Sequence, residues 1–254
     1  FSALPLVACG VLKIAYDLWR KGLPVVGVPK TIDNDVAGTL VTFGFDSAVT
    51  TATEAIDKLH TTAESHDRVM VVELMGRDAG WIALHSAVSS SADIVLLPEI
   101  PFDIERVCDA IRQREASGRH YSIVVVAEGA RPKGGEALLV ERRAVGTVDR
   151  LGGIGSRVAA AIAERTGKET RSLVLGHLQR GGGPTTSDRL IALRFGTAAV
   201  RAIAAGTFGT MVAYTPPTIS TVPLVDVIGR TKLVPLDSDT LQTARDIGIS
   251  FGDK

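Results

Sequence analysis

Short, continuously apolar runs alternate with amphipathic stretches along most of the chain. Several runs contain Val, Ile and Leu without a polar residue at every second position, which is typical of strands covered on both faces in a parallel sheet. The predicted strands span residues 4–8, 24–28, 69–74, 94–97, 122–127, 172–175 and 211–214. The predicted helices span residues 12–21, 46–62, 104–115, 154–165 and 189–205. Strand followed by helix, repeated, predicts an α/β sheet with right-handed crossovers.

The overall charge excludes partners that bind through a bulk electrostatic field. Lys plus Arg and Asp plus Glu each number 28, so we expect no nucleic-acid partner and no attraction to an anionic membrane. No apolar run approaches the length of a membrane span. The two cysteines, Cys9 and Cys108, lie far apart and favour a reducing compartment. A length of 254 residues is enough for one large domain or two small ones.

Polar residues gather directly after four of the predicted strands. In open α/β sheets, ligands bind beyond the carboxyl ends of the strands, and glycines there let a ligand approach the backbone. The four segments are Lys30-Thr31-Ile32-Asp33-Asn34-Asp35, Met75-Gly76-Arg77, Glu128-Gly129, and Gly176-His177-Leu178-Gln179-Arg180 with three further glycines. Strand order and direction therefore predict a convergent polar site.

The residue types in these segments favour phosphoryl transfer, which needs positioning and charge neutralisation more than covalent help. Asp33 or Asp35 could accept the proton of a hydroxyl nucleophile, and Arg77 or Mg²⁺ could neutralise the transferred group. Four basic residues would suit a second phosphate on the substrate: Arg68, Arg171, His177 and Arg180.

Each signal also has an interpretation without function. The acidic segment could form a solvated Asx-type turn, and Arg77 could form a surface ion pair. His177 could be structural, and Glu128 could be a carboxylate at a helix N-terminus. We expect His60 and His66, which flank a helix end, to be solvated.

Several long motifs resemble those of the 6-phosphofructokinase family. They are PKTIDND, FGFDSAVTTATEAID, VVELMGRDAGWIALHSA, VLLPE, VVVAEGA and RSLVLGHLQRGGGPTTSDR, in order between Leu12 and Phe251. LHTTAESH and the ending ISFG are most similar to the actinobacterial type. The resemblance implies two Rossmann-like αβα sandwich domains. The larger, nucleotide-binding domain would comprise residues 1–44 and 184–235, and the smaller, sugar-phosphate-binding domain residues 45–183 with the tail 236–254.

The resemblance implies a role for each candidate residue. Asp33 would take the proton from the sugar 1-hydroxyl, Asp35 would help hold the metal and phosphate, and Thr31 would hydrogen-bond near the 1-position. Arg77 would stabilise the moving phosphoryl group. The implied sugar-holding residues are Met75, Gly76 and Glu128, and those for the 6-phosphate are His177 and Arg180. Arg68 and Arg171 would reach the 6-phosphate of a neighbouring subunit, which implies a homotetramer with shared active sites.

The sequence departs from the family pattern where the nucleotide should bind. A glycine-rich phosphate loop with a Mg²⁺-ligating acid is expected at Val7-Ala8-Cys9-Gly10-Val11, and Leu40-Val41 replaces an expected acidic–aromatic pair. Valine and alanine carry a Cβ where the backbone should approach phosphate, and cysteine is a poor ligand for a hard cation. We therefore expect an N-terminally truncated chain with an incomplete larger domain, no dedicated metal ligand, and a rate lowered by roughly 10³ or more.

Two positions bear on the phosphoryl donor. By resemblance to the family, Gly10 would occupy a selector position where glycine favours ATP, whereas Lys30 would stand where lysine is found in pyrophosphate enzymes and in some actinobacterial ATP users. The resulting hypothesis is a cytoplasmic glycolytic kinase that uses ATP with Mg²⁺ to convert fructose 6-phosphate into fructose 1,6-bisphosphate. Two alternatives stay open: a non-catalytic sugar-phosphate-binding homologue or inactive subunit, and a pyrophosphate-dependent phosphofructokinase.

Overall fold

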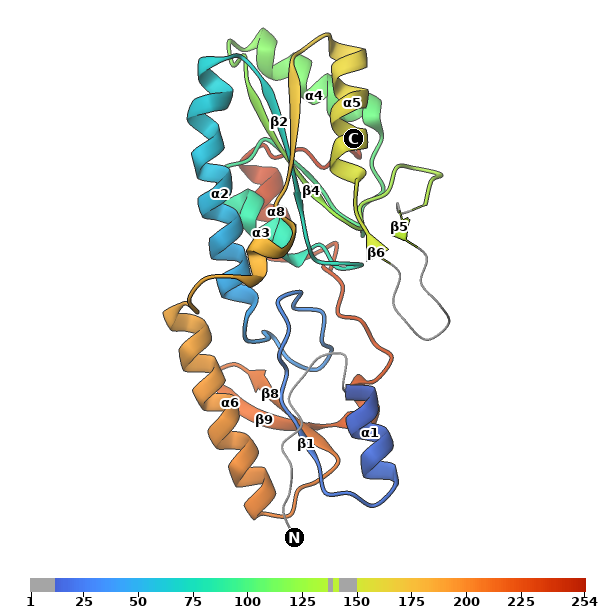
Figure 1. Ribbon diagram of the computed structural model, residues 1–254, viewed down its shortest axis with the longest axis vertical. Helices are drawn as coiled ribbons and strands as arrows, with labels where there is room; N and C mark the ends of the chain where they lie inside the picture. The colour runs from blue at the N-terminus through green and yellow to red at the C-terminus, as the bar shows by residue number, and fades with distance from the viewer. Residues whose placement is uncertain (1–11, 137–138, 142–149) are drawn as a thin grey trace. The chain divides into compact units, whose positions relative to one another are not determined.

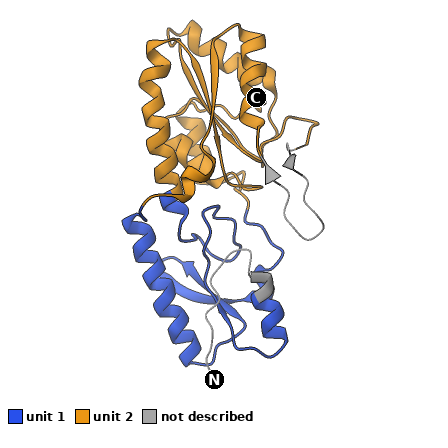
Figure 2. Cartoon of the chain, viewed as in Figure 1, with its two compact units in different colours: residues 1–47, 183–232 blue, residues 48–182, 233–254 orange. Residues whose placement is uncertain are grey.

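The computed structural model describes residues 12–136, 139–141 and 150–254 (Figure 1). The chain forms two compact units: unit 1 comprises residues 1–47 and 183–232, and unit 2 comprises residues 48–182 and 233–254 (Figure 2). The boundaries that we expected from the resemblance were 44/45, 183/184 and 235/236. The binding of a nucleotide to one unit and of a sugar phosphate to the other stays a prediction. The predicted strand 4–8 lies outside the described residues.

Unit 2 contains a four-stranded sheet in which all strands are parallel, in the order β3-β4-β2-β7. Its strands are β2 (Val69–Leu74), β3 (Ile94–Leu96), β4 (Ser122–Ala127) and β7 (Thr170–Val174). Every residue of β4 is buried, as a continuous apolar run predicts for a strand covered on both faces. A separate antiparallel pair joins β5 (Leu139–Glu141) and β6 (Arg150–Leu151). The predicted α/β class is confirmed.

Helices cover both faces of this sheet (Figure 1). On one face, α4 (Ile104–Ala116) and α5 (Ile154–Thr166) pack on alternate residues of the strands in one continuous core. On the other face lie α3 (Trp81–Ser89) and α8 (Asp239–Asp246), with α2 (Phe45–Ser65) beside them. The C-terminal segment packs back on the sheet, as predicted, because Ser250 bridges Ile94 at the start of β3.

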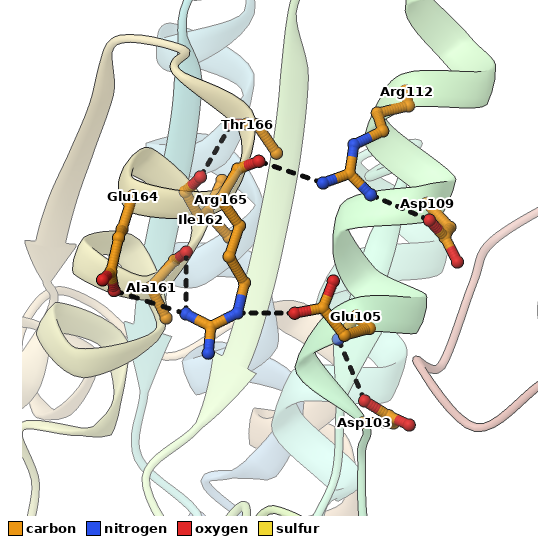
Figure 3. A network of polar contacts seen from close by, with 9 residues as sticks. All are labelled: Asp103, Glu105, Asp109, Arg112, Ala161, Ile162, Glu164, Arg165 and Thr166. Atoms are coloured by element: carbon orange, nitrogen blue, oxygen red, sulfur yellow. Dashed lines mark hydrogen bonds and ion pairs between the residues drawn. The ribbon is translucent and has the colours of Figure 1, made fainter.

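One ion pair and one hydrogen bond join the two helices that share a face (Figure 3). Arg165 of α5 donates from Nε to Glu105 Oε1 of α4 at 2.7 Å. Arg112 of α4 donates to the carbonyl of Arg165 at 3.0 Å and to Asp109 at 2.9 Å. These groups are largely exposed, so they add little to stability. The buried aliphatic core between the helices and the strands contributes most of the packing energy.

Unit 1 contains a smaller, mixed sheet with the order β1-β8-β9. Strand β1 (Val26–Gly27) is parallel to β8 (Thr210–Thr215), and β9 (Thr218–Pro223) returns antiparallel to β8. Helix α6 (Thr186–Ala204) packs on one face, and α1 (Leu12–Arg20) with the short α7 (Leu224–Val227) on the other. Unit 1 is thus also a three-layer α/β arrangement.

Helix α6 begins three residues earlier than its apolar pattern predicts, because Thr185 caps it. The Thr185 side chain accepts a hydrogen bond from the Asp188 N–H at 3.2 Å. The buried Asp188 carboxylate in turn accepts hydrogen bonds from the N–H groups of Gly44 and Ser47, at 2.7 and 2.8 Å. This contact fixes the chain that leads from the end of the acidic segment into α2.

In the part of the chain that the structure describes, none of the helices combines the length and the apolar character that a membrane span requires.

Candidate functional site

The acidic segment that follows β1 is a buried, irregular loop. Thr31, Asp33 and Asn34 are only 6%, 7% and 3% exposed, so the interpretation as a solvated turn is wrong. Thr31 Oγ1 accepts a hydrogen bond from the Asp33 N–H at 3.0 Å and lies 3.3 Å from Asp33 Oδ2, to which it donates. Thr42 Oγ1 donates to the Thr31 carbonyl at 2.8 Å. The loop is therefore fixed by contacts on both sides of Asp33.

Asn34 turns the loop and takes part in a second set of contacts. Its φ of 54° lies in the left-handed region, which asparagine tolerates better than most residues. Asn34 Oδ1 accepts hydrogen bonds from the Thr42 N–H at 3.1 Å and from Lys232 Nζ at 2.8 Å. Sequence reasoning gave Asn34 no role and missed Lys232, which lies far from the loop in the chain.

Burial lowers the pKa of Lys232 to about 8, and the neighbouring Asp35 acts in the opposite direction. In the unfolded chain, Lys232 keeps its ordinary pKa near 10.5. Between about pH 8 and 10.5, the unfolded chain therefore binds this proton more fully than the folded chain does. The stability contribution of Lys232 therefore rises as the pH increases through this window.

A pH series of unfolding experiments tests this shift. The free energy of unfolding of the wild type, minus that of Lys232→Arg, is expected to increase by up to about 3 kcal/mol between pH 8 and 10.5. Arginine keeps its charge throughout this range, so the subtraction removes the titration of all other groups. Urea unfolding at each pH measures the difference, and a constant difference would contradict the shifted pKa.

In unit 2, three of the predicted polar segments follow the carboxyl-terminal ends of neighbouring strands. The register pairs Leu74 with Ala127 and Glu73 with Val174, so the carboxyl ends of β2, β4 and β7 are neighbours. The segments that follow these ends contain Met75, Gly76, Arg77, Glu128, His177 and Arg180. The convergence predicted for these six residues is therefore observed at the level of the strand ends.

Glu128 joins two of these segments. Its Oε1 accepts hydrogen bonds from the N–H groups of Gly76 and Arg77, at 3.3 and 3.0 Å. No helix begins at Glu128, because residues 128 and 129 form a turn, so the interpretation as a helix N-terminal carboxylate is wrong. Glu128 instead orders the backbone that carries Arg77.

Arg77 stands on a tightly constrained backbone. Its φ is 52° and its side chain is exposed. The Arg77 carbonyl oxygen packs so closely on Gly129 that a Cβ built there would lie 2.0 Å away from it. Only glycine fits at residue 129 without moving Arg77.

A short 3₁₀ helix, η2 (Gly176–Arg180), follows β7. In a 3₁₀ helix, side chains three residues apart lie one above the other, so His177 and Arg180 share a face. Both are exposed, whereas Gln179 is buried and donates to the Gly176 carbonyl at 3.3 Å. This geometry suits the recognition of one anionic group by both basic side chains.

Arg68 and Arg171 lie near the amino-terminal ends of β2 and β7, at the opposite end of these strands from Arg77 and His177. Arg68 precedes β2 and Arg171 is the second residue of β7, so the six residues of β2, about 20 Å, separate Arg68 from Arg77. Both arginines contact Glu169, at 2.9 and 2.5 Å, and the hydrogen bond from Arg68 lowers the pKa of Glu169. Within one chain, these two arginines therefore do not lie with His177 and Arg180, and their predicted contact with the 6-phosphate of a neighbouring subunit stays a prediction.

Glu73 is a buried acid that sequence reasoning missed. Its two carboxylate oxygens accept hydrogen bonds from Gly153 N at 3.0 Å and Gly155 N at 2.7 Å, at the start of α5. The available signal was a single acid inside the apolar run VMVVEL, since a buried charge needs partners. Glu73 thus ties α5 to the strand that leads to Arg77.

Replacing Glu73 by alanine is expected to lower the free energy of unfolding by about 3 kcal/mol, because two N–H groups lose a charged acceptor. Glu164→Ala is the matched control, since that α5 glutamate is 80% exposed and should change stability by less than about 0.5 kcal/mol. Urea unfolding followed by circular dichroism measures both. Equal effects of the two changes would exclude this role of Glu73.

The sequence matches the family model described as Phosphofructokinase over residues 7–203. The chain belongs to the phosphofructokinase family. The relative from Chloroflexus aggregans, named ATP-dependent 6-phosphofructokinase, is 53% identical over 245 residues, which cover 96% of this chain and 67% of the relative. A relative of the same name from Corynebacterium efficiens is 50% identical and covers 93% of this chain and 68% of its own length.

A third relative carries a different name. It is the pyrophosphate–fructose 6-phosphate 1-phosphotransferase of Amycolatopsis methanolica, 54% identical over 91% of this chain and 68% of its own. Among solved structures, pyrophosphate-dependent phosphofructokinase from Marinobacter aquaeolei has a TM-score of 0.75 at 25% identity, with 93% of this chain and 62% of that chain covered. Phosphofructokinase from Saccharomyces cerevisiae has a TM-score of 0.71 at 30% identity, with 93% and 30% covered. These likenesses confirm the predicted phosphofructokinase fold.

Other predictions have mixed outcomes. Gly10 and the rest of residues 7–11 lie outside the described residues. Lys30 is exposed and bridges Phe43 through its backbone. His66 is exposed, as predicted, but His60 is half-buried and its Nε2 contacts the Ser90 carbonyl at 2.8 Å, so its prediction as solvated is wrong.

Unit 2 also has a polar cavity of about 390 Å³ near the start of β3. None of the predicted site residues lines it. Asp93, Arg114 and Asp109 are among its lining residues, and Asp93 pairs with Arg114 at 2.7 Å. The cavity lies away from the strand ends where this fold binds ligands, so we assign it no part in the candidate site.

Proposed function

We propose that this chain transfers a phosphoryl group from ATP to the 1-hydroxyl of fructose 6-phosphate and produces fructose 1,6-bisphosphate. The observation that carries the proposal is the buried, doubly anchored loop that presents Asp33, in a chain 53% identical to a relative named ATP-dependent 6-phosphofructokinase. A carboxylate fixed in this way suits general-base catalysis, which requires a defined position before the substrate arrives.

Unit 1 supplies the proton acceptor. Asp33 accepts the proton of the 1-hydroxyl as the new O–P bond forms, and the donor's O–P bond breaks to release ADP. Thr31 donates a hydrogen bond to Asp33 Oδ2, which fixes the orientation of the Asp33 carboxylate. Thr31 therefore orients the base as well as lying near the 1-position.

Mg²⁺ fits the residues of this loop, although it stays a prediction. Within residues 12–136, 139–141 and 150–254, no group of three or more His, Cys, Asp or Glu residues could form an all-protein metal site. Mg²⁺ is instead commonly bound by one or two carboxylates together with substrate phosphates. We assign this carboxylate role to Asp35, and the ion would neutralise charge on the transferred group.

Unit 2 supplies the groups that hold the sugar phosphate and stabilise charge. Arg77 stabilises the moving phosphoryl group, and the backbone hydrogen bonds to Glu128 keep its segment in place. Met75, Gly76 and Glu128 hold the sugar. His177 and Arg180, on one face of η2, bind the 6-phosphate.

A homotetramer with shared sites is part of the proposal. Arg68 and Arg171 lie at the opposite end of their strands from His177, so a role for them in 6-phosphate binding requires a neighbouring subunit. In the single chain, both arginines contact the Glu169 carboxylate. In the tetramer, the 6-phosphate of the neighbouring subunit's site would replace that carboxylate as their partner. The location of the reaction in the cytoplasm stays a prediction.

ATP is the proposed donor, and pyrophosphate is the second candidate. The relatives named ATP-dependent favour ATP, whereas the Amycolatopsis relative at 54% identity is named for pyrophosphate. Lys30 is exposed directly after the buried Pro29, where its ammonium group can meet either donor. Gly10, which would favour ATP, lies outside the described residues.

A coupled turnover assay with ATP–Mg²⁺, and separately with pyrophosphate, tests the donor, and calorimetry with fructose 6-phosphate tests the sugar site. We expect saturable binding of the sugar phosphate and faster turnover with ATP. Faster turnover with pyrophosphate would favour the second donor. Binding without turnover would favour a non-catalytic sugar-phosphate-binding homologue, and absence of both would exclude the proposed function.

A further inference from the structure

Lys232 inserts its side chain into the loop that carries the proposed base. It follows α7 and lies 198 residues after Asn34 in the chain. Its ammonium group donates to Asn34 Oδ1 at 2.8 Å, to the Thr39 carbonyl at 3.0 Å and to the Leu40 carbonyl at 2.9 Å. Asn34 lies at one end of a bend in the loop, and Thr39 and Leu40 lie at the other end. A single nitrogen atom therefore holds the two ends of the bend together.

The backbone at Lys232 makes a second connection to the same loop. The Lys232 N–H donates to the Asp35 carbonyl at 2.8 Å, and Thr231 forms an antiparallel bridge with Val36. Asp35 is thus flanked by a backbone contact on one side and, through Asn34, by a side-chain contact on the other. Neither Asp33 nor Asp35 can shift far without breaking one of these hydrogen bonds.

The donor count of Lys232 separates its role from that of a ligand for phosphate. A lysine ammonium has three N–H donors, and three acceptors already engage Nζ. Since its donors are used within the protein, Lys232 has no N–H directed at an incoming phosphate. Its effect on the reaction must therefore pass through the position of the loop.

We propose that Lys232 is a positioning residue for phosphoryl transfer, because its ammonium group fixes Asn34 and the carbonyls of Thr39 and Leu40 and thereby sets the position of Asp33 and Asp35. The inference rests on the proposed function. Displacement of a catalytic group by about 1 Å can lower a rate by about 10²-fold. The groups assigned to hold the sugar phosphate are in unit 2, whereas Lys232 and the loop that it contacts are in unit 1.

Lys232→Met tests the inference, because methionine keeps an unbranched apolar side chain and removes the ammonium group. We expect kcat to fall by about 30- to 100-fold while KM for fructose 6-phosphate changes less than about two-fold. In hydrogen exchange, the Thr42 amide should lose protection, because its acceptor Asn34 Oδ1 is no longer held. A variant that was only less stable would contain less active protein, so its apparent kcat would fall. The Thr42 amide would then not lose protection selectively.

Lys168→Met is the matched control. Lys168 is also a half-buried lysine that donates to a carbonyl, that of His120, at 2.7 Å, but it lies outside the proposed machinery. The kcat of Lys168→Met should stay within about two-fold of the wild type.

If Lys232→Met does not fold, Lys232→Arg replaces it, since arginine keeps the charge but cannot direct three donors from one nitrogen. A fall in kcat of at least about five-fold is then expected.

The outcomes separate the inference from the function on which it rests. Wild-type kcat in a folded Lys232 variant, or unchanged Thr42 exchange, would overturn the positioning role. Absence of turnover in the wild type with either donor would overturn the proposed function instead, and the exchange measurement would still decide whether Lys232 orders the loop.

Discussion

Asp33→Asn is expected to lower kcat by about 10³-fold and to leave KM for fructose 6-phosphate within about two-fold. The amide has nearly the same shape but cannot accept the proton of the 1-hydroxyl, and general-base catalysis contributes typically 10²–10⁴-fold. The Asp33 N–H can still donate to Thr31 Oγ1, so the loop should keep its path. A coupled assay at saturating donor measures both constants.

Asp57→Asn provides the control for this substitution. Asp57 is an exposed aspartate of α2, and its replacement should leave kcat within about two-fold. If turnover survives Asp33→Asn at the wild-type level, Asp33 is not the base, and Asp35 becomes the next candidate.

Gly129→Ala is expected to lower kcat by about 10²-fold and the free energy of unfolding by about 2 kcal/mol. A Cβ at this position would lie 2.0 Å from the Arg77 carbonyl oxygen, so the backbone of Arg77 must move away. Overpacking of this kind costs typically 1–3 kcal/mol, and a displaced Arg77 no longer meets the transferred group in the required geometry. Steady-state kinetics and urea unfolding measure the two effects.

Gly196→Ala is the matched glycine control. Gly196 lies within α6, and a Cβ added there meets no heavy atom within 4 Å. Alanine in a helix interior should stabilise the chain by about 0.5–1 kcal/mol and leave kcat unchanged. Wild-type kinetics in Gly129→Ala would show that the backbone at Arg77 tolerates displacement, which would remove the reason given for a glycine at residue 129.

Strands with uninterrupted apolar residues were predictable from the sequence. β2 and β4 have the predicted bounds, because each is an apolar run apart from Glu73 in β2 and Ser122 at the start of β4, and each is buried between two helical layers. β9 was missed because its residues, TISTVP, are half-exposed and lack an apolar run. α3 was missed for the opposite reason: it is apolar on nearly all sides, so no helical periodicity is visible.

The candidate site was predictable where it depends on single segments. The strands deliver Asp33, Arg77, Glu128 and His177 at their carboxyl ends, and a polar group directly after an apolar run is a local signal. Contacts between distant segments left no such signal, which is why Lys232 was missed. The positions of Arg68 and Arg171 also could not be predicted from the sequence. Only the register and direction of β2 and β7 reveal that both arginines lie near the amino-terminal ends of these strands.

The central claim is that this chain places a phosphoryl group on the 1-hydroxyl of fructose 6-phosphate. Phosphorus NMR of fructose 6-phosphate with ATP–Mg²⁺ and the wild-type chain tests it most directly, because the spectrum distinguishes a phosphate ester at carbon 1 from free phosphate. We predict a growing 1-phosphate signal of fructose 1,6-bisphosphate, matched by ADP and nearly absent with Asp33→Asn. Release of free phosphate without a 1-phosphate ester, or no reaction with either donor, would contradict the account.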